Sequence, residues 1–107
     1  MSALLVLSTV PNEETAKIIA HNLIGQNLAA CISFQKGLTS VFMWEGKIQE
    51  ENEVLLLIKT KQALFETLKT TLYALHPYDV PEIIAFDISH GHTPYLQWID
   101  SVTKETV

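Results

Sequence analysis

The stretch LTSVFMWEGKIQEENEVLLLIKT, Leu38 to Thr60, decides the fold of this chain. It contains two β-rich arms, residues 38–44 and 47–60, which meet at Glu45-Gly46. Glycine at the second central position of a tight hairpin turn supplies the positive φ that the turn needs. The sequence therefore predicts a long β-hairpin.

The predicted hairpin is long for a chain of 107 residues. Pairing about the turn places Met43 opposite Ile48 and Val41 opposite Glu50. A second arm of about 13 steps, at roughly 3.3 Å each, reaches about 43 Å. A compact chain of this length has a radius of gyration of about 13 Å, hence a diameter of roughly 34 Å. We therefore expect the hairpin to extend beyond one monomer and its tip to contact another copy of the chain.

The composition is that of a globular protein. The length predicts a single domain, residues 1–107. Apolar residues make up 48% of the chain and charged residues 18%, a balance typical of a core-forming protein. The first apolar run, residues 3–7, is too short to span a membrane and lacks the basic flank of a signal peptide. We expect a soluble, cytoplasmic protein that does not bind membranes.

The charge and the cysteine content exclude several classes of site. The net charge is −5, and all seven basic residues are Lys, so the chain lacks the Arg side chains most used to bind phosphate and guanine. We expect no nucleic-acid binding. The single cysteine, Cys31, excludes an internal disulfide and a cysteine-rich zinc site. In its apolar context, LAACI, the simplest interpretation is a small buried side chain.

Strands and helices alternate along the chain. The run ALLVLST, residues 3–9, is apolar on both faces and suits a strand buried on both sides. Asn12 is predicted to cap the first helix, with Gly25 and Asn27 as candidate ends, and Gly37 to bend the second strand into the hairpin. The further expected elements are a strand at 28–34, a helix at 64–75 ended by His76-Pro77, a strand at 82–89, a loop at 90–94 and a helix at 95–102.

The order β-α-β-β-α-β predicts the fold class. It is the ferredoxin-like arrangement, an α+β fold in which an antiparallel sheet carries two helices on one face. To this the sequence adds the long hairpin between the second and third strands and a short C-terminal helix. Several unrelated activities use this fold, so the fold alone does not assign a function.

A series of short motifs runs from Leu5 to about Ile99. It comprises LAAC at 28–31, WEGK at 44–47, Glu53, IKT at 58–60, HPY at 76–78, PE at 81–82 and YLxW at 95–98. Together these motifs resemble the divalent-cation tolerance family, CutA. The resemblance implies a ferredoxin-like protomer in a tight homotrimer, with hairpins that pair between subunits and an architecture similar to the PII signalling proteins. It also implies a link to tolerance of copper and other divalent cations, and no enzymatic activity.

Histidines are the candidate metal ligands. His90 and His92 form a HxH pair, and imidazoles suit Cu(II), Zn(II) and Ni(II). Two ligands fall short of the usual four, so the simplest interpretation is two exposed histidines without a metal, and a metal site is the alternative. His76 is the third candidate. Its simplest interpretation is a helix C-terminal residue that is hydrogen-bonded there, and the alternative is a ligand contact in a cleft. The copper site proposed in some relatives of the CutA family falls here on Ser8, Leu75 and His76, so two of its ligands are missing. We expect no required cofactor and at most weak binding of Cu(II) or another divalent cation.

The second hairpin arm carries an acidic run, Glu50, Glu51 and Glu53. Strand alternation places Glu50 on the face opposite the other two. A solvated edge that discourages wrong pairing is the simplest interpretation. The resemblance offers another, in which Glu53 and Lys59 pair or line a cleft between subunits. The residues expected at this ligand cleft are Cys31, Glu53, Lys59, Tyr78, Glu82 and Tyr95.

Large apolar residues near the hairpin tip are expected at the trimer interface. Met43 and Trp44 lie beside the tip, where a lone monomer would cover them poorly. Phe42 and Trp98 are expected to pack at the same interface or in the core. The CutA family usually has Tyr where this chain has Phe42, so a hydroxyl contact is missing there.

Three function classes follow from these observations. The preferred one is a homotrimeric CutA-type protein that responds to divalent metal ions through weak metal or small-ligand binding. The alternative is a non-enzymatic, PII-like signalling or structural trimer that docks partner proteins. The third, an enzyme such as an acylphosphatase of the same fold class, requires an Arg-bearing phosphate loop that this chain lacks. We therefore expect no enzymatic activity.

Overall fold

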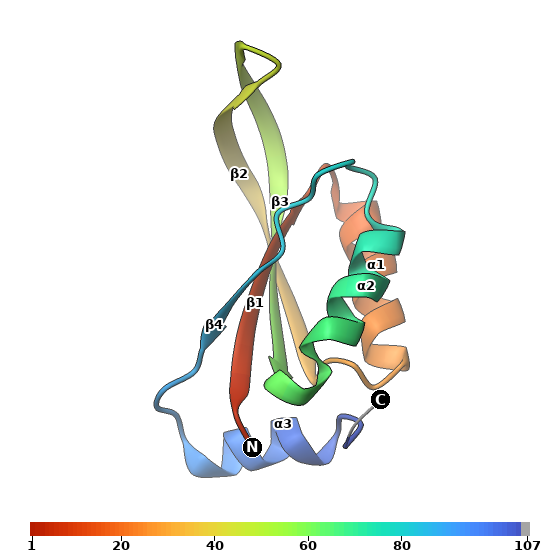
Figure 1. Cartoon of the computed structure of the whole chain (residues 1–107), viewed down its shortest axis with the longest axis vertical. Helices are drawn as coiled ribbons and strands as arrows, with labels where there is room; N and C mark the ends of the chain where they lie inside the picture. Colours follow the sequence, from red (N-terminus) through yellow and green to blue (C-terminus); the bar gives the residue numbers. More distant parts are fainter. Residues whose placement is uncertain (106–107) are drawn as a thin grey trace.

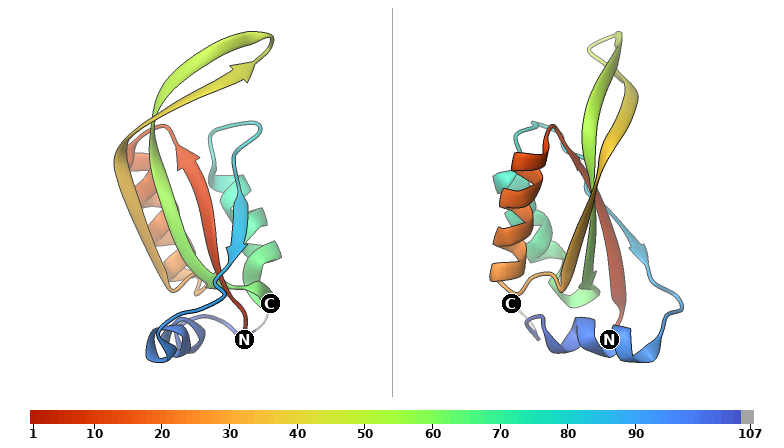
Figure 2. Two further views of the ribbon diagram at one scale, coloured as in Figure 1. Left: turned by 90° about the vertical axis from the view of Figure 1, so that its left-hand side faces the viewer. Right: turned by 180° about the vertical axis from the view of Figure 1, so that it is seen from behind.

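The hairpin is part of a four-stranded antiparallel sheet in this computed structural model, which describes residues 1–105. The elements in chain order are β1 (Ala3–Val10), α1 (Glu13–Gly25), β2 (Cys31–Trp44), β3 (Lys47–Lys61), a short 3-10 helix (Gln62–Leu64), α2 (Phe65–Leu75), β4 (Ile84–Asp87) and α3 (Thr93–Ser101). The strands lie in the order β2-β3-β1-β4. Helices α1 and α2 cover one face of this sheet (Figures 1 and 2). The predicted α+β, ferredoxin-like arrangement is confirmed.

The core lies between the sheet and the two helices. Alternate residues of β1 and β3 point toward the helices, and Val6, Leu56 and Ile58 among them are fully buried. They pack in one cluster with the apolar stripes of α1 and α2, which include Ile19 and Leu68. Burying one such side chain stabilises the fold by roughly 1.5–3 kcal/mol. The helical and strand periodicities of the sequence therefore meet in a single core.

The hairpin extends beyond this core (Figure 1). The predicted register is confirmed, with Met43 opposite Ile48 and Val41 opposite Glu50. The longest dimension of the molecule is 44 Å, against 26 and 22 Å across. β2 is one continuous strand of 14 residues, which bends at a register shift between Gln35 and Leu38. This shift contains Gly37, whose φ of 84° confirms the predicted bend.

Several predicted boundaries are wrong, although the elements exist. β2 begins at Cys31 instead of residue 28, because Leu28 and Ala29 fill the core as a loop. β4 spans Ile84–Asp87 alone, because it lies at the edge of the sheet and pairs only with β1 over Leu4 to Leu7. α3 begins at Thr93, inside the predicted loop, because proline is well suited to the first turn of a helix.

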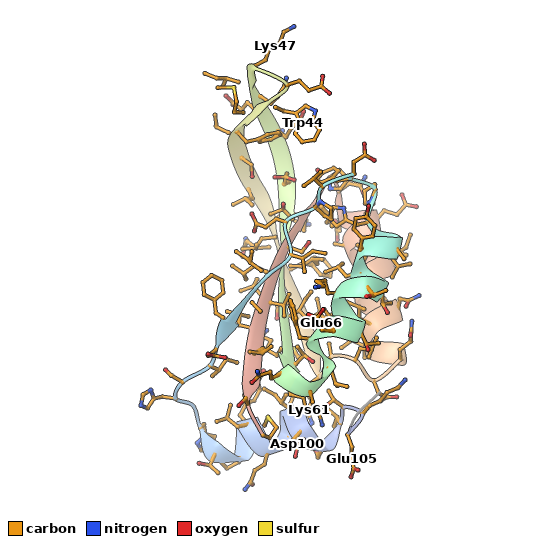
Figure 3. All side chains as sticks on the ribbon, viewed as in Figure 1. Trp44, Lys47, Lys61, Glu66, Asp100 and Glu105 are labelled. Carbon is orange, nitrogen blue, oxygen red and sulfur yellow. The ribbon has the colours of Figure 1, made fainter. Side chains whose placement is uncertain are left out.

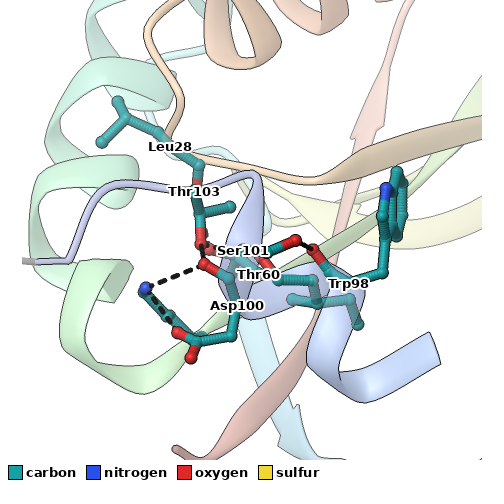
Figure 4. A network of polar contacts seen from close by, with 8 residues as sticks. Leu28, Thr60, Trp98, Asp100, Ser101 and Thr103 are labelled. Carbon is teal, nitrogen blue, oxygen red and sulfur yellow. Dashed lines mark hydrogen bonds and ion pairs between the residues drawn. The ribbon is translucent and has the colours of Figure 1, made fainter. Parts of the chain in front are cut away.

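Polar contacts attach α3 and the C-terminal segment to the sheet (Figure 4). The Lys61 ammonium, only 4% exposed, lies 2.8 Å from Asp100 Oδ1. The Thr60 hydroxyl donates a 2.6 Å hydrogen bond to the Leu28 carbonyl. The Thr103 hydroxyl donates to the Ile99 carbonyl at 2.9 Å. The Lys61–Asp100 ion pair therefore fixes α3 against the end of β3, while the two hydroxyls attach β3 to the loop before β2 and close the end of α3.

Candidate functional site

A surface cleft of about 840 Å³ lies between the hairpin and the connection that follows α2. Aromatic side chains of β2 and carboxylates of β3 form one side, and the connection supplies further acidic residues. We call it the hairpin cleft and define it by Phe42, Trp44, Glu51, Glu53, Tyr78, Asp79 and Glu82. Among the residues that the structure describes, no Lys or His lines this cleft. Its electrostatic character is therefore acidic.

Glu53 is the most buried of the cleft carboxylates, with 7% of its surface exposed. The Tyr78 hydroxyl donates a 2.9 Å hydrogen bond to Glu53 Oε2. Burial and the neighbouring Glu53 carboxylate raise the pKa of Tyr78, so the phenol stays protonated and keeps donating. No Lys among residues 1–105 forms an ion pair with Glu53.

His76 ends α2 and connects it to the sheet. Its Nε2 lies 2.8 Å from the Thr9 carbonyl oxygen, and the Tyr78 backbone N–H donates to its Nδ1 at 3.1 Å. These contacts fix the neutral tautomer that carries its proton on Nε2. Burial lowers the pKa of His76, which also favours the neutral ring. The helix-end interpretation is thus supported, because both ring nitrogens are already engaged.

Within this chain His76, the outside candidate for a metal ligand, lies far from His90 and His92. His76 binds the carbonyl of Thr9 near the end of β1, whereas Ile88, shortly before His90, donates its backbone N–H to Ala3 at the start. Six residues of strand separate these two positions by roughly 20 Å. Within residues 1–105 no three His, Cys, Asp or Glu side chains are placed to hold one metal ion.

Cys31, Lys59 and Tyr95 form a second group, at the end of the sheet nearest α3. The Lys59 ammonium lies 3.0 Å from the Ser33 hydroxyl and 3.9 Å from Cys31 Sγ. Burial and the adjacent Cys31 side chain raise the pKa of Tyr95. Cys31 itself is half-buried in this chain.

The six residues expected at one ligand cleft therefore separate into two groups within this chain. Glu53, Tyr78 and Glu82 line the hairpin cleft, whereas Cys31, Lys59 and Tyr95 lie elsewhere. Within one chain Glu53 and Lys59 do not pair with each other, because Glu53 contacts Tyr78 and Lys59 contacts Ser33. The two residues lie six positions apart on β3, roughly 20 Å along the strand.

Large apolar side chains are exposed along the outer hairpin. Figure 3 shows Trp44 and Lys47 at its end, away from the helices. The exposed fractions of Val41 and Met43 are both 64%, and that of Ile48 is 74%. The remaining two, Phe42 and Trp44, are 41% and 45% exposed.

The sheet face opposite the helices is a second apolar surface, which the sequence analysis did not identify. Leu5 and Leu7 of β1 point to this face and are only half-buried, while Phe86 of β4 is 51% exposed. The sequence run 3–9 suited a strand buried on both faces, yet the helices cover only one. That mismatch is the signal that could have revealed this surface. We define the open sheet face by Leu5, Leu7, Leu55, Leu57, Ile84 and Phe86.

One known protein family matches nearly the whole chain. The family described as CutA1 divalent ion tolerance protein matches residues 4–102. The chain belongs to the CutA1 family. It is 49% identical over 94 residues to the divalent-cation tolerance protein CutA of Thermus thermophilus, covering 88% of this chain and 91% of that protein. It is 44% identical over 96 residues to human protein CutA, covering 90% of this chain and 54% of the human protein.

Solved CutA structures have the same fold. The Thermus thermophilus structure of divalent cation tolerance protein Cut A1 superposes with a TM-score of 0.93 at 46% identity, covering 95% of this chain and 99% of that one. CutA1 from Oryza sativa superposes with a TM-score of 0.96 at 42% identity, covering 99% and 97%. The chain spans little more than half the length of several plant and vertebrate CutA proteins.

The cellular location stays a prediction. Within residues 1–105, no helix has the length and apolar character needed to cross a membrane. One CutA relative is named chloroplastic and another periplasmic. These names show that CutA proteins occur in more than one compartment.

Proposed function

We propose that this CutA-family chain works as a homotrimer that takes part in divalent-cation tolerance through weak binding of metal ions or a small ligand. The proposed assembly rests on the exposure of large apolar side chains on the outer hairpin. A monomer rarely exposes a contiguous apolar patch of this kind. The open sheet face adds a second such surface, and a neighbouring copy that covers both removes them from water.

The choice of three copies comes from the CutA resemblance, because exposure alone does not set a subunit number. The tip residues Met43 and Trp44 are then expected to contact a neighbour, together with Phe42. Trp98 is 42% exposed, and its ring is tilted against that of Tyr95 with the centroids 5.7 Å apart. It is expected at a further interface contact.

The Trp44→Asp variant tests this assembly. A carboxylate in an apolar contact loses its hydration, so the variant is expected to dissociate or to lose several degrees of melting temperature. Ile18→Asp is the matched control, because Ile18 is 56% exposed on α1, away from both apolar surfaces. A Trp44→Asp variant that keeps both the sedimentation mass and the melting temperature of the wild type would contradict the proposed interface.

The metal part of the proposal rests on His90 and His92. His90 Nδ1 lies 3.0 Å from the Ser89 hydroxyl, and His92 precedes α3 as its N-cap; both are exposed. Two imidazoles without further protein ligands are expected to bind Cu(II) only weakly, with a Kd of roughly micromolar or above. Binding requires neutral rings, because a protonated imidazole has no free nitrogen lone pair for the metal.

Calorimetric titration with Cu(II) tests this part. The His90→Ala/His92→Ala double variant is expected to lose most of the binding, and Cys31→Ser to keep it. Nanomolar binding that depends on Cys31 would contradict the proposal, because it would require a site that these two histidines do not form.

One observation favours the second candidate, a PII-like signalling or structural trimer that docks partner proteins. Residues 1–105 place no three metal-binding side chains together. Under this alternative the hairpins serve assembly and partner docking alone. Saturable binding of an ion or small molecule by the trimer would exclude it.

A further inference from the structure

We propose that His76 is a pH-sensitive latch, whose neutral ring holds the segment after α2 against β1 and whose protonation releases that segment. We call this segment, residues 77–82, the strap. The strap carries Tyr78 and forms the wall of the hairpin cleft on the side opposite the hairpin. The proposed latch goes beyond the proposed function and is independent of it, because the contacts of the latch lie within one chain.

The two ring nitrogens of His76 have opposite roles in their hydrogen bonds. Nε2 lies 2.8 Å from the Thr9 carbonyl oxygen, which can only accept, so Nε2 carries the proton and donates. The Tyr78 backbone N–H can only donate, so Nδ1, 3.1 Å away, accepts and carries no proton. Protonation of the ring would add a hydrogen to Nδ1 and set two donors against each other. The contact with the Tyr78 N–H therefore exists only while the ring is neutral.

Few other contacts hold the strap. It belongs to no helix or strand, and two of its six residues are proline, which has no backbone N–H to donate. Two further hydrogen bonds attach it within residues 1–105. The Tyr78 hydroxyl donates to Glu53 at 2.9 Å, and the Tyr73 hydroxyl makes a long contact of 3.5 Å with the Asp79 carbonyl. A segment with so few attachments can open locally while the rest of the protein stays folded.

Tyr78 couples the latch to the hairpin. Its backbone N–H is held by His76, and its hydroxyl donates to Glu53 at the base of the hairpin. The rings of Tyr78 and His76 also pack against each other, with their centroids 4.8 Å apart. Release of the latch frees the Tyr78 backbone and weakens the contact with Glu53. The strap then separates from β1 and from the hairpin together.

The groups around His76 determine the pH at which the latch opens. β3 supplies the Glu53 carboxylate, which favours the protonated ring, and the strap supplies the neutral Tyr78 phenol. β1 supplies the Thr9 carbonyl oxygen, and Glu13 at the start of α1 is already paired with two lysines. Burial outweighs Glu53, so the pKa of His76 lies below its ordinary value of 6.5. The latch is therefore closed at neutral pH and opens in mild acid.

The test follows the His76 ring and the Tyr78 backbone amide by nuclear magnetic resonance of the full chain, from about pH 7.5 to about pH 5. Protection of an amide is its hydrogen-exchange rate relative to that of an unstructured chain at the same pH. Protonation of His76 is expected to lower the protection of the Tyr78 amide at least about tenfold, with one shared midpoint below pH 6.5. Ile58, fully buried in β3, is the reference, and its amide is expected to keep its protection.

His76→Asn separates the latch from other effects of pH. The asparagine Oδ1 can accept the Tyr78 N–H in place of Nδ1 but does not titrate, so the protection of the Tyr78 amide is expected to stay constant. His21→Asn is the matched control, because His21 is exposed on α1, and it is expected to keep the wild-type response. A pH response that persists in His76→Asn would contradict the latch.

Three results for the wild-type protein alone would also overturn the proposal. The first is a Tyr78 amide that keeps its protection although the His76 ring becomes protonated. The second is a His76 ring that stays neutral until the whole protein unfolds in acid. The third is a loss of Ile58 protection, or of the mass of the sample, at the same midpoint, which would assign the change to global unfolding or to dissociation.

Discussion

The Tyr78 hydroxyl donates a 2.9 Å hydrogen bond to Glu53 Oε2 and so connects the segment after α2 to the base of the hairpin. The two residues lie 25 positions apart in sequence. Two residues earlier, His76 binds the Thr9 carbonyl and attaches the same segment to β1. The acidic cleft therefore has a fixed wall on the side opposite the hairpin.

Removal of this hydrogen bond is expected to destabilise the fold. Tyr78→Phe leaves the buried Glu53 carboxylate without its donor and should lower the free energy of unfolding by about 1–3 kcal/mol. Tyr73→Phe is the control, because the Tyr73 hydroxyl makes only a long, exposed contact of 3.5 Å with the Asp79 carbonyl. Urea unfolding at one fixed chain concentration measures both variants. Equal stabilities would show that Glu53 does not depend on Tyr78.

His76 is expected to make stability depend on pH. Burial lowers the pKa of His76 in the folded chain below its ordinary value of 6.5. The unfolded chain then binds the proton more tightly than the folded chain. The contribution of His76 to the free energy of unfolding is therefore fully present above pH 6.5 and declines as the pH falls through this value. His76→Gln should reduce this decline. Urea midpoints measured across the range give the result, and identical slopes for wild type and variant would assign the decline to other groups.

The hairpin turn carries a residue in an unfavourable backbone conformation. Glu45 has φ of 51° and is followed by Gly46 at 77°, so both central positions are left-handed. Glutamate disfavours this region, whereas asparagine adopts it readily. Glu45→Asn should therefore stabilise the protein by a few tenths to about 1 kcal/mol. Lys47→Asn, next to the turn at ordinary φ, should bring no gain; an equal gain in thermal unfolding from both would contradict this account.

Two buried hydroxyls should respond in opposite ways to removal. Ser8 is fully buried, and its hydroxyl has no hydrogen-bond partner among residues 1–105. Ser8→Ala should be neutral or stabilising by up to about 1 kcal/mol. Thr60→Val removes a 2.6 Å hydrogen bond to the Leu28 carbonyl and should destabilise by about 1–3 kcal/mol. Calorimetric melting compares them, and a destabilised Ser8→Ala would reveal an unrecognised partner for this hydroxyl.

Local patterns in the sequence were sufficient to predict the fold. The Glu45-Gly46 turn sets the register of the two arms, and the Asn12 side chain accepts a 2.8 Å hydrogen bond from Thr15 N–H, as expected of a helix cap. Both signals act within a few residues. Element ends were less predictable, because burial of Leu28 in the core overrides its strand propensity.

The candidate site could be predicted only in part. Family motifs named Glu53 and Tyr78 separately, but their contact depends on how the segment after α2 folds back onto the hairpin. Glu53 and Lys59 do not pair within one chain, because residues six positions apart on an extended strand lie roughly 20 Å from each other. Spatial partners from different elements have no local signal in a single sequence.

The mass of the wild-type protein in dilute solution tests the central claim most directly. Light scattering should give three times the 12.0 kDa of one chain, because a trimer covers the outer hairpin and the open sheet face. The mass should persist on dilution to the lowest concentration that can be measured. A mass of 12.0 kDa under these conditions would contradict the account, because the exposed apolar surfaces would then have no neighbouring copy to cover them.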